Sequence, residues 1–277
     1  SCMVCASRVS EERRRELSAA IVAHPEFVPA LATFTLSHHR GQSCAAVLSL
    51  VKRAMARFMG GRAWLALRQV YDVVGYVAHL DCTYGENGWH WHYHVLFFFA
   101  WGADLELLPD DEKRFYTAER VARCELDFWL RWRDTCSALG VVVDSRAFDL
   151  RVGNDAVADY VNKYGRLPRL ERHGGKLKWS VSDEITKSVV KRARGDGRTP
   201  WQLLGEYALG DSAAGELFKE YFAAVKGSRL LRWSNGLRSL LGLGAELDAC
   251  ELVASDDKQP ELELLAELDL NQWRCVL

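Results

Sequence analysis

The chain reads Gly88-Trp-His-Trp-His-Tyr-His-Val95 before it enters the apolar run Leu96-Phe-Phe-Phe99, a strongly β-forming composition. Successive side chains of a strand point to opposite faces, so His90, His92 and His94 are expected on one face, about 7 Å apart. Imidazoles at that spacing can share a metal ion if a further ligand arrives from a neighbouring element. The stretch therefore predicts a strand that carries a metal site.

The preceding segment supplies that further ligand. Residues 70–83 are rich in valine and tyrosine and predict a strand, and Gly85-Glu-Asn-Gly88 predicts a hairpin turn that leads into the histidine strand. His79 and Asp81 alternate on the first strand, and Asp81 is expected near His92 across the hairpin. Two imidazoles and a carboxylate suit Mg²⁺ or Mn²⁺, and also Zn²⁺ or Fe²⁺.

The composition of the chain limits the classes of protein to which it can belong. The chain has 277 residues and is 49% hydrophobic, enough for one large domain or two smaller ones. No apolar stretch is long enough to span a bilayer and no signal peptide is recognisable, so we expect a soluble cytoplasmic protein without a membrane partner. Eight cysteines are too few for a disulfide scaffold. Four of them lie among apolar neighbours and are expected to be buried thiols: Cys44, Cys82, Cys124 and Cys136.

The Cys2-Met-Val-Cys5 segment at the start of the sequence is half of a zinc knuckle. No second pair follows at the usual distance. Because the chain begins with serine, a first pair would have to lie upstream. Cys2 and Cys5 are therefore either zinc ligands or incidental thiols.

Helical and strand patterns alternate in the first 165 residues. They predict an α+β fold, with helices on a largely antiparallel sheet, followed by a C-terminal region of two to four helices. Strands are expected over residues 30–37, 70–83, 90–101 and 141–150, and helices over 8–24, 43–59, 109–139 and 156–164.

Charge is distributed unevenly along the chain. Residues 151–200 hold twelve Lys or Arg against six Asp or Glu, whereas residues 244–277 hold nine acidic residues against two basic ones. The basic region suits a polyanion such as DNA, although it is also what a solvated surface helix looks like. Its candidate phosphate-binding residues are Lys176, Lys178, Lys191, Arg192 and Arg194.

Tyr160 and Tyr164 are four residues apart, so on a helix they lie on one face, with Lys163 beside them. The pair either packs a helix onto the sheet or supplies nucleophiles. Tyrosine is a poor nucleophile at neutral pH because its pKa is near 10, but a nearby cation and a metal on the electrophile both help. Attack on a phosphodiester would yield a covalent phosphotyrosine.

These motifs together resemble those of the HUH endonucleases, and within them the rolling-circle replication initiators of small bacterial and archaeal plasmids. The resemblance runs through most of the chain. It is carried by Phe34-Thr-Leu-Ser-His38, by Asp81-Cys-Thr-Tyr-Gly-Glu-Asn-Gly-Trp-His90, by Trp89-His-Trp-His-Tyr-His94, by Tyr160-Val-Asn-Lys-Tyr164, and by the later segments Arg198-Thr-Pro-Trp-Gln-Leu-Leu204 and Trp233-Ser-Asn-Gly-Leu-Arg238. Cys2-Met-Val-Cys5 resembles the second half of a cysteine-rich knuckle found in some members.

The resemblance implies an HUH-type antiparallel sheet and a metal held by His92 and His94. Asp81 takes the place of the family's usual glutamate, His79 could join or replace it, and His90 is an extra histidine before the motif. The implied regions are a knuckle segment and helix (1–24), the endonuclease domain (25–182), a helical DNA-binding or accessory region (183–243) and an acidic tail (244–277).

By the same resemblance, the protein nicks and rejoins single-stranded DNA at a plasmid's double-strand origin through a 5′-phosphotyrosine. The cofactor would be Mg²⁺ or Mn²⁺, with Zn²⁺ as an option at the N-terminus. Either tyrosine can be the first nucleophile, with Tyr160 slightly favoured. The partners would be extruded origin DNA and the host helicase and polymerase.

Three alternatives remain open from the sequence. The first is an HUH transposase or conjugative relaxase, and the second is an oxygenase with a two-histidine, one-carboxylate iron site. The third is a non-catalytic, zinc-containing DNA-binding regulator, in which Cys2 and Cys5 matter and the tyrosines only pack.

Overall fold

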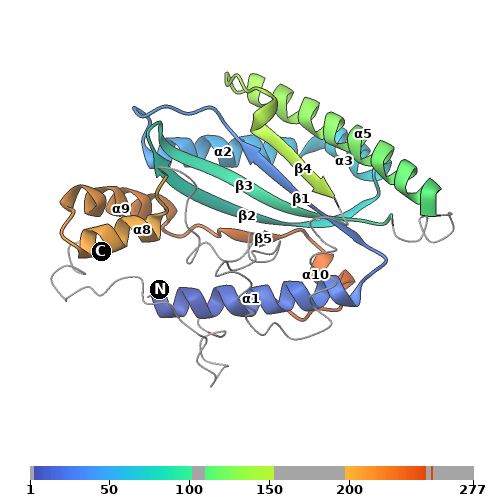
Figure 1. The fold of residues 1–277 in the computed structure, drawn as a ribbon, viewed down its shortest axis with the longest axis horizontal. Coiled ribbons are helices and arrows are strands. Elements are labelled where there is room, and N and C mark those ends of the chain that lie inside the picture. Colours follow the sequence, from blue (N-terminus) through green and yellow to red (C-terminus); the bar gives the residue numbers. More distant parts are fainter. Residues whose placement is uncertain (1–2, 102–109, 153–196, 248–250, 252–277) are drawn as a thin grey trace.

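A computed structural model describes residues 3–101, 110–152, 197–247 and 251 of the chain. Its centre is a sheet of order β4-β1-β3-β2-β5, in which every neighbouring pair is antiparallel. With helices on both faces of this sheet, the predicted α+β class is confirmed (Figure 1). The strands are β1 (Val28–Thr35), β2 (Val73–Gly85), β3 (Gly88–Phe99), β4 (Phe148–Val152) and β5 (Leu231–Trp233).

The helices divide between the two faces. Figure 1 shows α1 along one face of the sheet and α2, α3 and α5 along the other. No described helix is both long enough and apolar enough to cross a bilayer. The helices are α1 (Met3–Ala23), α2 (Cys44–Phe58), α3 (Gly61–Val70), α5 (Asp110–Ser137), α8 (Pro200–Ala208), α9 (Ser212–Val225) and α10 (Leu237–Leu240), with a short 3-10 turn, η1 (Ser145–Ala147).

The long hairpin of β2 and β3 sets the register of the sheet. Gly85 pairs with Gly88, so the connection is the two-residue loop Glu86-Asn87, as the Gly85–Gly88 turn predicted. Gly88 has φ +88°, a conformation that glycine adopts without strain. A Cβ at Gly88 would also lie 2.9 Å from Cα of Arg40, so the loop before α2 packs directly on the turn.

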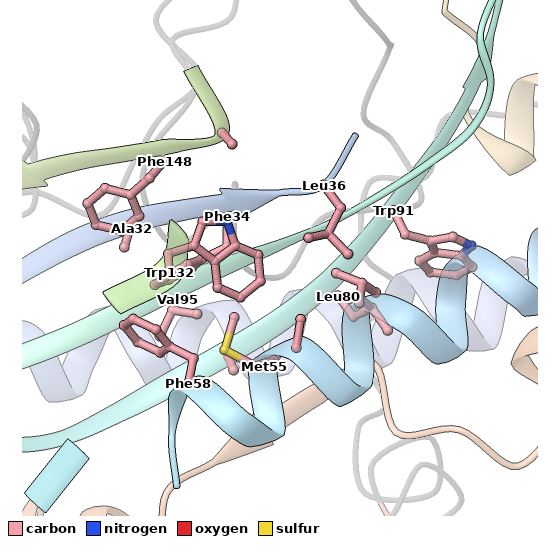
Figure 2. Close-up of a cluster of buried hydrophobic side chains, with 14 of the residues drawn as sticks. Ala32, Phe34, Leu36, Met55, Phe58, Leu80, Trp91, Val95, Trp132 and Phe148 are labelled. Atoms are coloured by element: carbon pink, nitrogen blue, oxygen red, sulfur yellow. The ribbon is translucent and has the colours of Figure 1, made fainter. Parts of the chain in front are cut away.

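The two faces of the sheet are filled differently. The face under α2 and α5 holds the larger core, in which Phe34, Phe58 and Trp132 pack edge to face within 6.0 Å (Figure 2). Aromatic pairs in this geometry add to the stabilisation from burial. The opposite face holds a smaller apolar cluster that joins α1 to β2, β3, β5 and α10, and Leu17 and Phe98 belong to it.

Helix α9 anchors the C-terminal region to the larger core. Trp89 and Trp91 are buried on the face opposite the histidines, and Tyr221 stacks on Trp91 at 5.7 Å. The Glu220 carboxylate accepts hydrogen bonds from Trp89 Nε1 at 3.0 Å and from the Cys44 amide at 2.7 Å. One side chain of α9 therefore holds both β3 and the start of α2.

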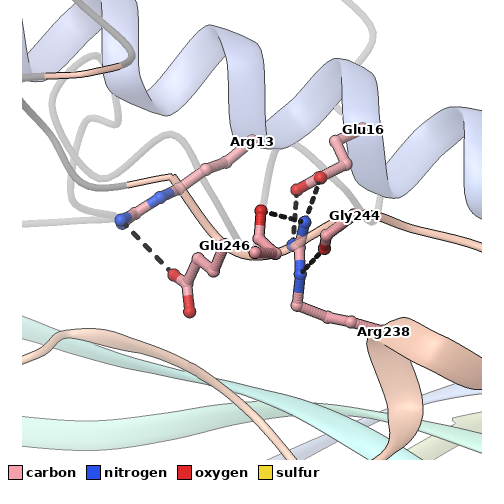
Figure 3. Close-up of polar contacts among 6 residues, drawn as sticks. Arg13, Glu16, Arg238, Gly244 and Glu246 are labelled. Carbon is pink, nitrogen blue, oxygen red and sulfur yellow. Dashed lines mark hydrogen bonds and ion pairs between the residues drawn. The ribbon is translucent and has the colours of Figure 1, made fainter.

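A second connection joins α1 to the C-terminal segment on the other face. The Arg238 guanidinium donates to both carboxylate oxygens of Glu16, at 2.8 and 2.5 Å, and also to the backbone oxygen of Gly244 (Figure 3). Arg13 forms an ion pair with Glu246 at 3.5 Å. These contacts hold the first described helix and the end of the described chain together.

The structure differs from the sequence-based expectations in one strand that starts later than predicted and in two elements that were not predicted. The strand expected over residues 141–150 begins only at Phe148, because Val141 to Val143 follow Gly140 (φ +75°), three residues beyond the end of α5 at Ser137, and lead into η1, which Asp144 caps. Val142 is 87% exposed, so a β-branched run without a partner strand stays irregular. Helix α3 and strand β5 were not predicted.

Candidate metal centre

The register of the hairpin brings the alternating histidines beside the carboxylate. Asp81 pairs with His92, and His79 pairs with His94. Side chains of directly opposed residues lie on the same face, so β2 and β3 present all four groups on the face that α1 partly covers. The predicted proximity of Asp81 to His92 is confirmed.

Three of these side chains form a compact group. The Nε2 atoms of His92 and His94 lie 3.1 Å apart, and Asp81 Oδ2 lies 3.6 Å from His92 Nε2. One ligand atom from each of the three residues lies within 4.8 Å of the other two. Among the residues that the structure describes, this is the one group of three or more histidine, cysteine or acidic side chains close enough to share a metal ion. Two imidazole nitrogens and a carboxylate oxygen fit a divalent transition metal, and the donor set does not select one metal.

Two further contacts hold the ligand side chains in place. The Cys82 amide donates to Asp81 Oδ1 at 2.8 Å, which leaves Oδ2 as the oxygen directed to the histidines. Thr33 Oγ1 of β1 lies 3.2 Å from His94 Nδ1. The sequence did not point to Thr33, because its position opposite His94 depends on the pairing of β1 with β3, which no local pattern encodes.

His79 is a neighbour of this group. It is only 3% exposed and pairs with His94, but none of its atoms belongs to the three-residue group. Asp81, and not His79, is the residue of β2 that belongs to the three-residue group.

His90 contacts a different partner. Its ring lies 4.7 Å from that of His38, edge to face, and 5.1 Å from that of His92. Burial, together with the neighbouring His38, lowers the pKa of His90 to about 4. His90 does not belong to the three-residue group, which agrees with its expected place outside the ligand set.

The other predicted site residues cannot be placed. Cys5 falls within α1, and nothing is described of its side chain. The predicted nucleophiles, their lysine, the basic residues and the first cysteine lie outside the described residues: Tyr160, Lys163, Tyr164, Lys176, Lys178, Lys191, Arg192, Arg194 and Cys2.

After residue 196, the described chain resumes beside β2, the strand that carries Asp81. Arg198 and Tyr84 exchange two backbone hydrogen bonds of 2.8 Å, and the Arg198 guanidinium lies over the Tyr84 ring. Tyr84 is three residues from Asp81 on β2. Before the gap, the description ends at Val152 on edge strand β4.

Comparisons with known proteins give one relative. No protein-family profile and no solved structure matches the chain significantly. The chain is 24% identical to "Protein rep" of Streptomyces lividans over an alignment of 340 positions, which covers 99% of this chain and 70% of the relative. The likeness to a Rep protein over almost the whole chain supports the resemblance to Rep-type replication initiators that the sequence motifs predicted.

Proposed function

We propose that the protein initiates plasmid replication by the rolling-circle mechanism, nicking and rejoining one DNA strand at the origin. The observation that carries the proposal is the group formed by Asp81, His92 and His94 on one face of the sheet. The relative named "Protein rep" supports the same biological role.

The three ligand side chains would hold a divalent ion, Mg²⁺ or Mn²⁺. When bound there, such an ion supplies Lewis-acid stabilisation of charge on a phosphate oxygen. Burial of Asp81 and His94, 5% and 6% exposed, limits their contact with water and favours a fixed ligand geometry.

The nucleophile would come from Tyr160 or Tyr164. The phenolic oxygen attacks phosphorus and forms a tyrosine–phosphate bond, the bond to the departing 3′ oxygen breaks, and the phenol proton is lost as that oxygen gains one. The 5′ phosphate remains on the protein and the freed 3′ hydroxyl primes synthesis. Lys163 would stabilise the charge of the phosphate, and the second tyrosine would serve the closing cleavage after one round.

The remaining parts of the proposal concern binding. The basic residues from Lys176 to Arg194 would contact phosphates of an extruded single strand in the bacterial or archaeal cytoplasm. The host helicase and polymerase would extend the primed strand. Cys2 and Cys5 would bind Zn²⁺ only together with a further ligand pair.

The test is a covalent-adduct assay. The protein is incubated with labelled single-stranded DNA fragments that tile its plasmid, in Mn²⁺, and analysed on a denaturing SDS gel. We expect a labelled protein band that disappears with EDTA and with the His92→Ala variant. The Tyr160→Phe and Tyr164→Phe variants then identify the first nucleophile.

Tyr207→Phe is the matched control, because Tyr207 lies on α8 and its hydroxyl makes no hydrogen bond to any described residue. This variant is expected to form the adduct like the parent protein. The absence of an adduct with every fragment and every divalent metal would refute the nicking activity and favour a non-catalytic DNA-binding protein. An adduct that survives the loss of both Tyr160 and Tyr164 would refute their role as nucleophiles.

A further inference from the structure

The contact of Thr33 with His94 joins the neighbouring strand β1 to the metal centre. Thr33 is paired with His94 in the register, and its hydroxyl oxygen lies 3.2 Å from His94 Nδ1 in a part-buried position. Thr35 is paired with His92 on the same face, two residues further along β1. The Thr35 hydroxyl makes no such contact with a described residue.

The chemistry of imidazole gives this contact a consequence. A neutral imidazole carries one hydrogen, and the partner of one ring nitrogen decides which nitrogen holds it. If Nδ1–H of His94 donates to Thr33 Oγ1, Nε2 of His94 keeps its lone pair. That Nε2 is the atom that lies 3.1 Å from His92 Nε2 in the ligand group.

We propose that Thr33 is a positioning residue that fixes the ring orientation and the tautomer of His94, so that Nε2 is ready to bind the metal. The inference rests on the proposed metal site and goes beyond it, because Thr33 touches no metal itself. Metal-bound histidines generally donate their other N–H to such an outer partner, and loss of that partner typically weakens metal binding about 10- to 100-fold.

The Asp81 carboxylate also has an outer contact, but that contact comes from a backbone amide, which a side-chain substitution does not remove. Asp81 Oδ1 is held by the backbone amide of Cys82, whereas Oδ2 is directed to His92. Among the described residues, Thr33 is an outer contact of this centre that a substitution can remove. Valine has nearly the shape of threonine, so Thr33→Val deletes the hydroxyl without opening a cavity.

The experiment measures Mn²⁺ binding to the full-length protein by calorimetry in the absence of DNA. We expect Thr33→Val to weaken Mn²⁺ binding about tenfold or more, and Thr33→Ser to restore it to within a few-fold of the parent protein. Thr35→Val is the matched control, on the same strand and face, and is expected to bind Mn²⁺ like the parent. Long-range ¹H–¹⁵N spectra of the metal-free protein should show His94 with hydrogen on Nδ1, and a loss of that preference in Thr33→Val.

The outcomes separate this inference from the proposed function. Equal Mn²⁺ affinity of Thr33→Val and the parent, or an equal loss in Thr35→Val, would overturn the role of Thr33 while leaving the metal centre in place. A His94 ring that carries its hydrogen on Nε2 in the metal-free parent would also overturn it. If the parent binds no Mn²⁺, or if His92→Ala binds it equally well, the proposed metal centre itself fails and the inference falls with it.

Discussion

Asp81 is one methylene shorter than the glutamate that the resemblance to HUH initiators implies at its position. Direct pairing with His92 brings its Oδ2 to 3.6 Å from the imidazole, so the missing methylene is offset by the position of the backbone. The amide of the next residue holds Oδ1 at 2.8 Å. The aspartate therefore presents one oxygen, Oδ2, to the histidine pair.

We expect Asp81→Asn to weaken Mn²⁺ binding by at least about tenfold, since the amide has no negative charge and is a poor metal ligand. The Mn²⁺ affinity of Asp81→Glu should lie between that of Asp81→Asn and that of the parent, because the longer side chain must fit into a buried position. Titration calorimetry measures both. Asp134→Asn is the control, because Asp134 pairs with Arg133 at the surface of α5, on the other face of the sheet. Parent-like binding by Asp81→Asn would remove Asp81 from the ligand set.

At the scale of elements, the hairpin of β2 and β3 carries most of the centre, and its turn could be predicted from sequence. The Gly85–Gly88 turn predicted that these two strands pair as a hairpin, and the alternation of histidines predicted that their side chains share one face of the sheet. What could not be predicted depends on partners far away in the chain. Strand β5 has only three residues and exists because it pairs with β2, and Thr33 acquires its place through β1.

The irregular elements were missed for a related reason. Helix α3 begins at Gly61, the second residue of a Gly60-Gly61 pair that is typical of a helix end. Gly61 has φ +74° and no neighbour that a Cβ would meet, so the chain turns there and a new helix starts. Trp64 is buried against the core and keeps that helix in place. This is a tertiary contact, which cannot be predicted from the local sequence pattern.

The packing around Gly88, the glycine at the hairpin turn, can be tested by comparing the stability of two glycine substitutions. Gly88 and Gly140 both have positive φ, at +88° and +75°, but only a Cβ at Gly88 would meet other atoms. We expect Gly140→Ala to destabilise the fold by about 1 kcal/mol, from the strained conformation alone. Gly88→Ala should cost clearly more, about 2–4 kcal/mol, because Arg40 or the turn must also move. Urea unfolding followed by tryptophan fluorescence measures both, and equal losses would contradict the packing of the Arg40 loop on the turn.

At the scale of the whole molecule, both ends of the described chain meet on the face of the metal centre. The smaller apolar cluster joins α1, β5 and α10 to that face. The bidentate pair of Arg238 and Glu16 lies beside it, with side chains 14% and 32% exposed. Such a pair resists screening better than a fully exposed one.

We expect a double-mutant cycle of Arg238→Gln and Glu16→Gln to give a coupling free energy of about 1 kcal/mol in favour of the native pair. Chemical unfolding of the parent, both single variants and the double variant provides the measurement. The same cycle on Arg146 and Asp144, an exposed pair on η1, should give a value near zero. A coupling for Arg238 and Glu16 no larger than that of the exposed pair would mean that the apolar cluster alone joins the two segments.

The order of the strands along the chain also bears on how the protein is made. Four of the five strands, and Thr33, Asp81, His92 and His94 with them, lie between residues 28 and 152, and pair with one another within that span. Synthesis proceeds from the N-terminus, and contacts between nearby segments form early. The four-stranded part of the sheet can therefore assemble on the ribosome before β5 is translated, so that the ligand set is gathered while the C-terminal half of the chain is still being made.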